Sequence, residues 1–213
     1  MSFLNYDTYI FDCDGVLIDS NCVKGKAFYK IAKKYDDQVA DKFLAYHQEH
    51  GGVSRFKKFE LLHTTFLENS SIDNIEKDLQ DFYDFMKDGL RHCEVCQGAA
   101  ELLPQLEGKK RFVSSGGFEP EVQNVLKMNN LDHYFKQIFG SPQTKYDHVE
   151  VIGKQVDLGK VVFIGDSITD LRVAEHFGFD FVFVTKYSQT PDLMMPKTIK
   201  SLVTTSLSEL IDP

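Results

Sequence analysis

The sequence lacks the long apolar runs that mark membrane proteins. No stretch approaches the roughly 18 consecutive apolar residues that a membrane-spanning helix requires. The first residues also lack the basic-then-apolar pattern of a secretory leader. We therefore expect a cytoplasmic protein with no membrane partner. Cysteine is scarce too, and a reducing cytoplasm would keep the thiols free; the cysteines are Cys13, Cys22, Cys93 and Cys96.

An excess of basic charge is missing as well. The chain carries 24 Lys and Arg against 32 Asp and Glu, which gives a formal charge of −8. A broad nucleic-acid interface needs a basic face, so we expect no nucleic-acid partner. The acidic balance does not exclude a small anionic substrate, because a metal ion and a few lysines set the field inside a site.

Internal repeats and low-complexity segments are absent. A hydrophobic content of 42% and a charged content of 26% are those of an ordinary globular protein. The 213 residues are enough for one large domain, or for a core with an inserted subdomain. None of these features indicates an oligomeric state.

Short β-branched and aromatic runs alternate with amphipathic stretches in the first and last parts of the chain. This alternation is typical of βαβ units around a parallel sheet. The expected strands are Thr8–Phe11, Arg111–Ser114, Gln137–Phe139, Val161–Ile164 and Phe181–Val184. The expected helices are Glu119–Met128, Lys145–Lys154 and Ile168–His176, and Ser206 to Glu209 resembles a capping box that opens a short terminal helix.

The pattern changes between about residues 20 and 91. Strand-like runs disappear, and apolar residues recur at helical spacing, as at Ile75, Leu79, Phe82 and Met86. This part predicts a bundle of about four helices inserted after the first strand. The predicted fold class is α/β: a Rossmann-like parallel-sheet core, residues 1–19 and 92–213, with an inserted helical bundle, residues 20–91.

The most informative segment places Asp12 and Asp14 directly after the first expected strand. Residues two apart on an extended backbone project to the same side. Both carboxylates would then face one point beyond the carboxyl end of the strand, where open α/β sheets bind ligands. Such a pair favours a divalent cation or a shared proton. The same residues are also ordinary turn chemistry, with Gly15 supplying a positive φ.

Two further motifs follow other expected strands. Ser114, with Ser115 and Gly116 after it, offers a hydroxyl and free backbone N–H groups to an anion. A serine that merely caps the next helix would look the same. Lys145 lies near the start of a helix, a position that is usually solvated surface when it stands alone.

A last motif combines Asp166, at a strand end, with Ser167 and Asp170. Ser167 can cap the following helix, and Asp170 lies in the first turn of that helix. The two residues could therefore be a capping box that happens to contain an acid. Taken singly, this motif does not decide between a structural and a chemical role.

Taken together and in this order, the motifs resemble those of the haloacid dehalogenase-like superfamily. Residues 12–20 are similar to its first motif, Ser114 to its second and Lys145 to its third. Residues 165–167 with Asp170 are similar to its fourth motif. The resemblance covers essentially the whole chain and points to the branch with a helical cap, which includes phosphatases and phosphoglucomutases.

The resemblance implies that Asp12 attacks phosphorus and forms an aspartyl-phosphate, which splits one hard displacement into two easier ones. Asp14 would protonate the leaving oxygen and then take a proton from the attacking water. Mg²⁺ would be held by Asp12, by the backbone carbonyl of Asp14 and by Asp166, with assistance from Asp170.

The resemblance also implies a cradle for the transferring phosphoryl group. Ser114, the neighbouring amides of Ser115 and Gly116, and Lys145 would hold its oxygens and neutralise their charge. Relatives that dehalogenate carbon lack the second acid of the first motif. Because Asp14 is present, phosphoryl transfer fits this chain better than attack on a carbon–halogen bond.

The inserted helices would form a lid over the substrate. Residues 52–55, Gly-Val-Ser-Arg, resemble a segment of β-phosphoglucomutases, and Arg55 could clamp a second phosphate or a carboxylate. A solvated Arg55 beside Lys57 and Lys58 is nearly as plausible. Lys24 stands where relatives often carry His; it could bind an acidic group of the substrate or point to solvent.

These observations rank three functions. The first is a Mg²⁺-dependent phosphatase for a small phosphorylated metabolite, such as a sugar phosphate. The second is a sugar-phosphate mutase, which must protect its aspartyl-phosphate from water. The third is a non-catalytic binding protein, since a fold does not fix a function.

Two smaller motifs are set aside. Cys93 and Cys96 have the spacing of half a zinc ribbon, but no second such pair exists, so we expect no metal or redox role. His47 and His50 have the spacing to share a metal, but a solvated helix end beside two glycines is the simpler interpretation. Cys13 should point into the core as a small hydrophobe.

Overall fold

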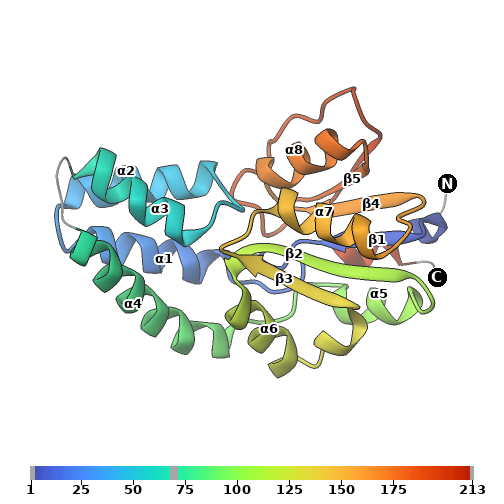
Figure 1. Cartoon of the computed structure of the whole chain (residues 1–213), viewed down its shortest axis with the longest axis horizontal. Coiled ribbons are helices and arrows are strands. Elements are labelled where there is room, and N and C mark those ends of the chain that lie inside the picture. Colours follow the sequence, from blue (N-terminus) through green and yellow to red (C-terminus); the bar gives the residue numbers. More distant parts are fainter. Residues whose placement is uncertain (1–2, 68–71, 212–213) are drawn as a thin grey trace.

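The computed structural model describes residues 3–67 and 72–211. A parallel sheet of six strands lies at its centre, in the order β3-β2-β1-β4-β5-β6 (Figure 1). The strands are β1 (Thr8–Phe11), β2 (Lys110–Phe118), β3 (Gln137–Ser141), β4 (Val161–Gly165), β5 (Asp180–Val184) and β6 (Ser201–Thr204). The chain builds β1 to β3 toward one edge and then returns, so the strand order reverses between the neighbours β1 and β4.

Alternate side chains of the strands enter two different cores. Phe11 and Ile164 belong to one hydrophobic cluster, and Ile10 and Phe163 belong to the other. Helices α5 (Ala99–Gln105) and α6 (Glu119–Met128) contribute to the first cluster; α7 (Lys145–Gln155) and α8 (Ile168–Phe177) contribute to the second. Because helices cover both faces, β1 and β4 are buried at every position, as expected for a parallel sheet.

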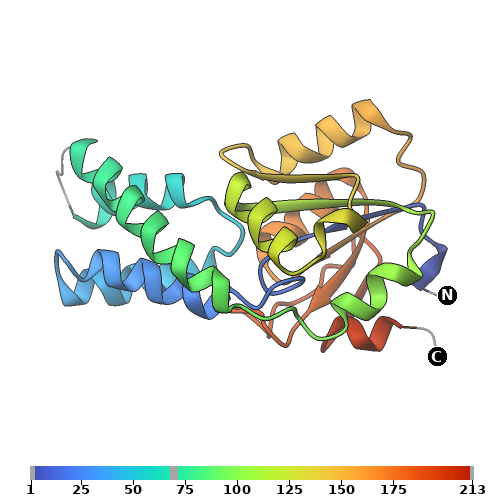
Figure 2. The ribbon, with the colours of Figure 1, turned by 90° about the horizontal axis from the view of Figure 1, so that it is seen from below.

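The segment between β1 and α5 forms a separate helical layer, which we call the insert. It lies beyond the carboxyl ends of the strands, while both termini lie at the opposite end of the core (Figures 1 and 2). The insert consists of α1 (Asn21–Ala32), α2 (Asp37–Glu49), α3 (Arg55–Leu61), the π-helical turn η2 (Leu62–Phe66) and α4 (Ile72–Gly89). Short 3-10 helices occur at Phe3–Asn5, Leu90–His92, Asp132–Tyr134 and Leu207–Leu210.

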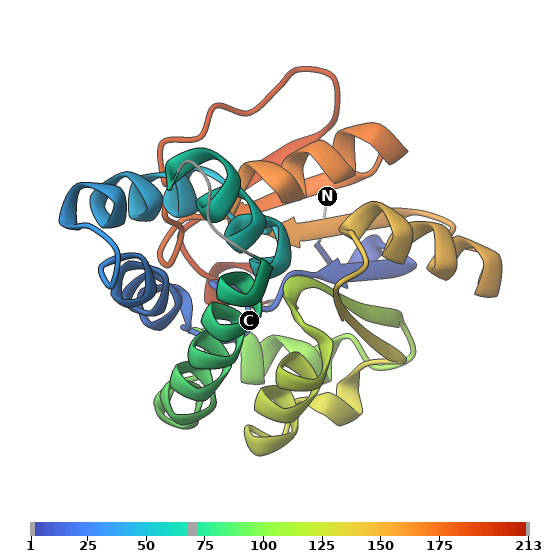
Figure 3. The same cartoon turned by 60° about the vertical axis from the view of Figure 1, so that its left-hand side comes forward.

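Aromatic side chains hold the insert together. Phe28, Phe43, Phe59 and Phe82 come from four different helices and are all buried. The ring centroids of Phe28 and Phe82 are 4.5 Å apart, and those of Phe28 and Phe59 are 5.5 Å apart. Burial of a phenylalanine contributes about 1.5–3 kcal/mol, so this cluster gives the insert a core of its own. Figure 3 shows the helices of the insert grouped beside the sheet.

The predicted fold class is confirmed, and all five expected strands are present. One strand and one α-helix were not anticipated. β6 is an edge strand whose Leu202 and Val203 are 48% and 54% exposed, so it carries no continuous buried run. Helix α5 is only seven residues long and contains Pro104, which hides its helical periodicity.

The predicted capping box at the C-terminal end is wrong. The short helix there is a 3-10 helix, and Ser206 makes no capping hydrogen bond to it. Glu209 Oε2 instead accepts hydrogen bonds from Thr204 Oγ1 at 2.7 Å and from Thr205 N at 3.0 Å. The glutamate therefore fixes the turn after β6 rather than the start of a helix.

Candidate active site

The site begins where β1 and β4 end side by side. Phe11 pairs with Ile164, and Asp12 N continues the ladder by donating to Ile164 O at 2.8 Å. Asp12, directly after β1, and Asp166, directly after β4, therefore emerge next to each other. This is the point at which the strand order reverses, the usual place for ligand binding in open α/β sheets.

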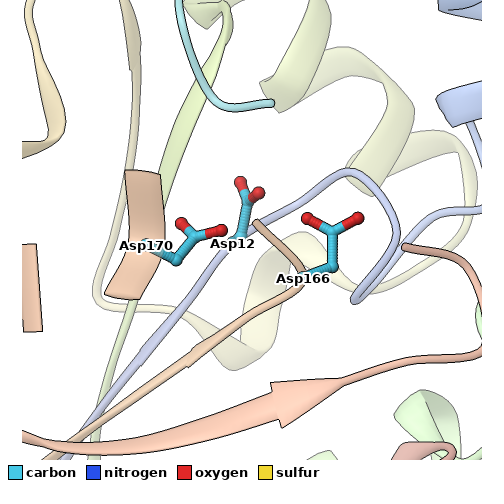
Figure 4. A group of neighbouring side chains, drawn as sticks. All are labelled: Asp12, Asp166 and Asp170. Carbon is cyan, nitrogen blue, oxygen red and sulfur yellow. The ribbon is translucent and has the colours of Figure 1, made fainter. Parts of the chain in front are cut away.

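Three buried carboxylates converge here, as Figure 4 shows. Asp12, Asp166 and Asp170 each offer an oxygen within 4.8 Å of the other two, and their exposed fractions are 3%, 5% and 0%. Burial raises the pKa of Asp166 well above its ordinary value, and the charges of Asp12 and Asp170 add to this effect. Burial also raises the pKa of Asp12, although the charge of Lys145 opposes it. A bound cation would relieve this concentration of negative charge.

Two carboxylate oxygens are open to such a cation. Asp12 Oδ1 accepts hydrogen bonds from Cys13 N at 2.7 Å and from Lys145, and Asp166 Oδ2 accepts from Asn21 Nδ2 at 2.7 Å. No described residue donates to Asp12 Oδ2 or Asp166 Oδ1. Both carboxylates point toward the same open side (Figure 4). Hard oxygen donors in this arrangement fit Mg²⁺ or a similar divalent ion.

Lys145, at the start of α7, forms ion pairs with Asp12 and Asp170. Its Nζ lies 2.9 Å from Asp12 Oδ1 and 2.5 Å from Asp170 Oδ1, and its side chain is 1% exposed. Burial alone would lower the pKa of Lys145, but the two aspartates raise it above its ordinary value, so the ammonium stays charged. Asp170 is itself fixed by Ser167, which donates from its N at 3.1 Å and its Oγ at 2.6 Å. The capping box expected around Ser167 and the charged site therefore use the same residues.

Asp14 lies in the loop after β1 and has three partners. Ser20 Oγ and Lys24 Nζ donate to its carboxylate, and Ser115 Oγ donates at 3.2 Å. Burial would raise the pKa of Asp14, but the charge and hydrogen bond of Lys24 and the hydroxyl of Ser20 lower it below its ordinary value. The loop depends on Gly15, whose φ is +74° and where a Cβ would collide with Asp166.

The two adjacent serines of β2, both expected at the site, face opposite sides of the sheet. Ser114 Oγ is fully buried and lies 2.9 Å from His148 Nδ1, on the face of the sheet that α7 covers. Ser115 Oγ reaches Asp14 and accepts from Gly117 N at 2.9 Å. Because side chains alternate along β2, only one of two consecutive serines can face the site. The expected placement of the Ser114 hydroxyl among the site residues is therefore corrected to Ser115.

Arg55 enters the same cleft but is already paired. Its Nη1 donates to Glu121 Oε1 at 2.7 Å, and its Nη2 donates to Glu121 Oε2. Its guanidinium carbon also lies 4.6 Å from the centroid of Phe82. Both members of the pair are buried, with exposed fractions of 6% and 9%. The expected clamp on a substrate anion is therefore occupied by a glutamate of α6, and the bidentate pair joins the insert to the core.

A second contact between the insert and the core comes from the two glycines before α3. Thr169 Oγ1, at the start of α8, donates to Gly51 O at 2.5 Å. A Cβ at Gly116 would collide with the carbonyl of Gly52, so the loop of the insert lies against the end of β2. The insert is therefore closed over the carboxyl ends of the strands in this structure.

The cleft between insert and core contains groups that the sequence patterns did not assign. They are Asn21, His47 and Lys58. The patterns also did not assign Glu121, which pairs with Arg55 of the cleft lining. Lys58 follows Arg55 by three residues on α3, a spacing that places both on one helix face. That spacing was the signal available in the sequence. Lys24, which was assigned to the site, lies in the cleft and is held by Asp14.

The residues of the two smaller motifs lie in different surroundings. Cys93 and Cys96 are free thiols, and the only group of three or more potential metal ligands within the described ranges is the aspartate cluster. His50 Nδ1 lies 2.9 Å from Tyr46 O, whereas His47 faces the cleft. Cys13 is 1% exposed and belongs to the hydrophobic core.

Comparison with known proteins identifies one family. The model of the family described as haloacid dehalogenase-like hydrolase matches residues 9–184. None of the curated proteins compared with the chain matches it. None of the helices in the described ranges is both long and apolar enough to cross a membrane.

Solved structures share the whole architecture at low sequence identity. A predicted phosphatase from Clostridium acetobutylicum is 22% identical with a TM-score of 0.75, and the match covers 96% of each chain. A predicted phosphoglycolate phosphatase from Haemophilus somnus is 16% identical with a TM-score of 0.75, also over 96% of each chain. A haloacid dehalogenase-like family hydrolase from Streptococcus pneumoniae is 21% identical with a TM-score of 0.70, over 96% of this chain and 97% of that one. At such identities the likeness establishes the fold.

Proposed function

The chain belongs to the haloacid dehalogenase-like hydrolase family, and from this premise we propose that it is a Mg²⁺-dependent phosphatase that hydrolyses a small phosphorylated metabolite. The observation that carries the proposal is the pairing of Asp12 with a second acid, Asp14, beside a buried cluster of carboxylates. Residues 20–91 act as the cap over this site, and residues 1–19 and 92–213 form the catalytic core.

Asp12 is the nucleophile. It emerges at the end of a fully buried strand, and its Oδ1 is held by Lys145 and by the Cys13 N–H, while no residue in the described ranges donates to Oδ2. A carboxylate needs no deprotonation before it attacks at neutral pH, provided that its charge is stabilised. Lys145, at 2.9 Å, supplies that stabilisation. Oδ2 attacks phosphorus, the bond to the leaving oxygen breaks, and an aspartyl-phosphate forms.

Asp14 moves the proton. It protonates the leaving oxygen in the first step and takes a proton from the hydrolytic water in the second. In the substrate-free protein, Lys24 and Ser20 hold it as a carboxylate. Asp14 must therefore bind a proton before the first step, and an anionic substrate that draws Lys24 away would raise its pKa and favour that protonation.

Ser115, Lys145 and the backbone N–H of Gly116 hold the phosphoryl oxygens. The Ser115 hydroxyl contacts Asp14, and Lys145 contacts Asp12. A phosphoryl group bound between Asp12 and Asp14 would therefore lie within reach of Ser115 and Lys145. Each such donor typically contributes roughly 10²–10³ in rate. Lys145 also neutralises charge that develops as the displacement proceeds.

Asp12, Asp166 and Asp170 would hold the Mg²⁺, with the backbone carbonyl of Asp14. The ion would neutralise the phosphoryl oxygens and screen the repulsion between the incoming dianion and the aspartates. Asp166 Oδ1, to which no described residue donates, fits the ion, and the Asp12 oxygen that does not attack phosphorus would be a second donor, while Asp170 fixes Lys145 and the start of α8.

Hydrolysis is favoured over mutase activity. The mutase alternative drew on the resemblance of residues 52–55 to β-phosphoglucomutases, and the Arg55 of this segment is bound through Nη1 and Nη2 by Glu121 and is not available to a substrate. A binding protein without catalysis would have no use for a buried lysine shared by two aspartates, since removing charged groups from water costs free energy.

The test is release of phosphate from a generic aryl phosphate by purified protein, with and without Mg²⁺. We expect Mg²⁺-dependent release that the Asp12→Asn variant abolishes. Asp41→Asn, which changes an exposed aspartate of α2, serves as the matched control and should retain the activity. Absence of release from the aryl phosphate and from a panel of sugar phosphates, phosphoglycolate and nucleotides would refute the proposal.

A further inference from the structure

We propose that Lys58 and His47 form a second anion-binding subsite, which receives a carboxylate or a second phosphate at the far end of the substrate. The inference rests on the proposed function, because it assumes that the phosphoryl group of the substrate lies at Asp12. It adds a substrate class: small phosphate esters that carry another negative charge.

Lys58 is a buried lysine that has no acidic partner in the part of the chain that the structure describes. Its exposed fraction is 1%, and it lines the cleft that also contains Asp12 and Asp14. Its Nζ lies 2.7 Å from His47 Nδ1, 3.4 Å from His47 O and 5.3 Å from the ring centroid of Phe28. Among the described residues, no carboxylate oxygen lies within 4.0 Å of this ammonium, so its charge is not paired.

His47 adds a buried ring nitrogen that has no hydrogen-bond partner among the described residues. When the charged ammonium of Lys58 donates to Nδ1, the proton of the neutral imidazole resides on Nε2. His47 is 6% exposed, and its Nε2 is buried without any hydrogen-bond partner among the described residues. A buried donor without a partner costs free energy, and an anion in the cleft would satisfy it.

The other cations of the cleft do not compete for this role. Arg55 is bound on two nitrogens by Glu121, and Lys24 is bound by Asp14. The one cleft cation among the described residues that has no acidic partner is therefore Lys58. Burial, and to a lesser degree the charge of Lys24, lowers the pKa of Lys58 to about 7. An anion beside it would restore its ordinary charge, so ligand and proton would bind together.

The position of Lys58 and His47 on the insert explains which ligands the subsite could distinguish. The nucleophile belongs to the core, and Lys58 and His47 belong to α3 and α2 of the insert. A ligand whose two ends are anionic would contact both parts of the protein at once. Such a ligand would hold the insert closed, whereas a neutral ester would contact the core alone.

Binding of two non-hydrolysable phosphonates tests the subsite without any turnover. The pair is 3-phosphonopropionate, which carries a carboxylate, and propylphosphonate, which does not. By calorimetry with Mg²⁺, we expect wild-type protein to bind the first about 10–100-fold more tightly, the range given by a hydrogen bond to a charged group. Lys58→Met should remove this difference. Lys57→Met, which changes the exposed neighbouring lysine on α3, should retain it.

Equal binding of the two phosphonates by wild-type protein would overturn the subsite, and so would a difference that survives in Lys58→Met. A purely structural role of the pair, holding α2 to α3, would lower the melting temperature of Lys58→Met without changing the ratio of affinities. If that variant does not fold, the pH dependence of wild-type binding decides. The preference for 3-phosphonopropionate should weaken as pH rises through about 7, and a preference that does not change would contradict the proposal.

Hydrolysis separates this inference from the proposed function. The ratio of kcat/KM for phosphoglycolate over ethyl phosphate should fall toward one in Lys58→Met, and a bisphosphate in place of phosphoglycolate shows which anion is preferred. Phosphate release with a wild-type ratio of one would refute the subsite alone. Tight binding of 3-phosphonopropionate without any phosphate release would refute the phosphatase alone.

Discussion

The ion pair between Arg55 and Glu121 predicts how strongly the insert is held against the core. In Glu121→Gln, Arg55 keeps Phe82 but loses the carboxylate that binds two of its nitrogens. Leaving a buried charge without its partner costs about 3–5 kcal/mol. Opening of the insert would hydrate Arg55, so the substitution raises the free energy of the closed form and not that of the open form. Since 1.4 kcal/mol is a factor of ten, the closed form should become roughly 100–4,000-fold less populated relative to the open form.

The assay is kcat/KM for an aryl phosphate, measured together with the melting temperature. If turnover requires closure, kcat/KM should fall by about 100-fold or more, whereas the melting temperature should change less because both parts stay folded. Glu150→Gln, which changes an exposed glutamate of α7, is the control. Replacing both Arg55 and Glu121 by Met should recover much of the loss, because no charge is then left unpaired. A value of kcat/KM for Glu121→Gln within about threefold of wild type, under 1 kcal/mol, would refute the reasoning.

Three other outcomes follow from the site. Ser115→Ala should lower kcat by about 10²-fold or more, while Ser114→Ala should mainly lower thermal stability; the reverse order in a kinetic comparison would contradict the assignment. Asp166→Asn should raise the melting temperature of the metal-free protein, because it removes a buried like charge, and should abolish the stabilisation by added Mg²⁺; a variant still stabilised by Mg²⁺ would contradict its role. Burial lowers the pKa of His148 from 6.5 to about 4, so the unfolded chain binds the extra proton between these values and stability falls as pH drops through this window. His148→Gln should lose less stability than wild type between pH 7 and 4 in chemical denaturation, and equal losses would contradict this account.

The fold was predictable because its central strands are buried on both faces. Runs such as Thr8–Phe11 and Val161–Gly165 read as continuous apolar segments, and each ends in residues that must leave the sheet. β6 could not be found in this way, because its side chains are half exposed and carry no such run. Helix α5 is too short for helical periodicity to identify it.

The acids of the site were predictable from the strand ends, whereas contacts across the cleft were not. Strand pairing brings Asp12 beside Asp166, and that pairing follows from the order of the motifs. The choice between Ser114 and Ser115 depends on the face that each residue of β2 presents, which a shift of one residue reverses. Likewise, the sequence names Arg55 but not Glu121, because the two residues lie 66 positions apart, one on the insert and one on the core.

The central claim is that Asp12 carries the phosphoryl group during turnover. It is tested most directly by quenching the reaction with acid within the first turnover in the presence of Mg²⁺ and locating phosphate on the peptides by mass spectrometry. With an aryl phosphate, whose leaving group departs without a proton from Asp14, we expect a phosphorylated peptide that contains Asp12. We expect more of it in Asp14→Asn, in which the base that activates water for the second step is missing. Phosphate release with no phosphorylated Asp12 in either protein would contradict the account.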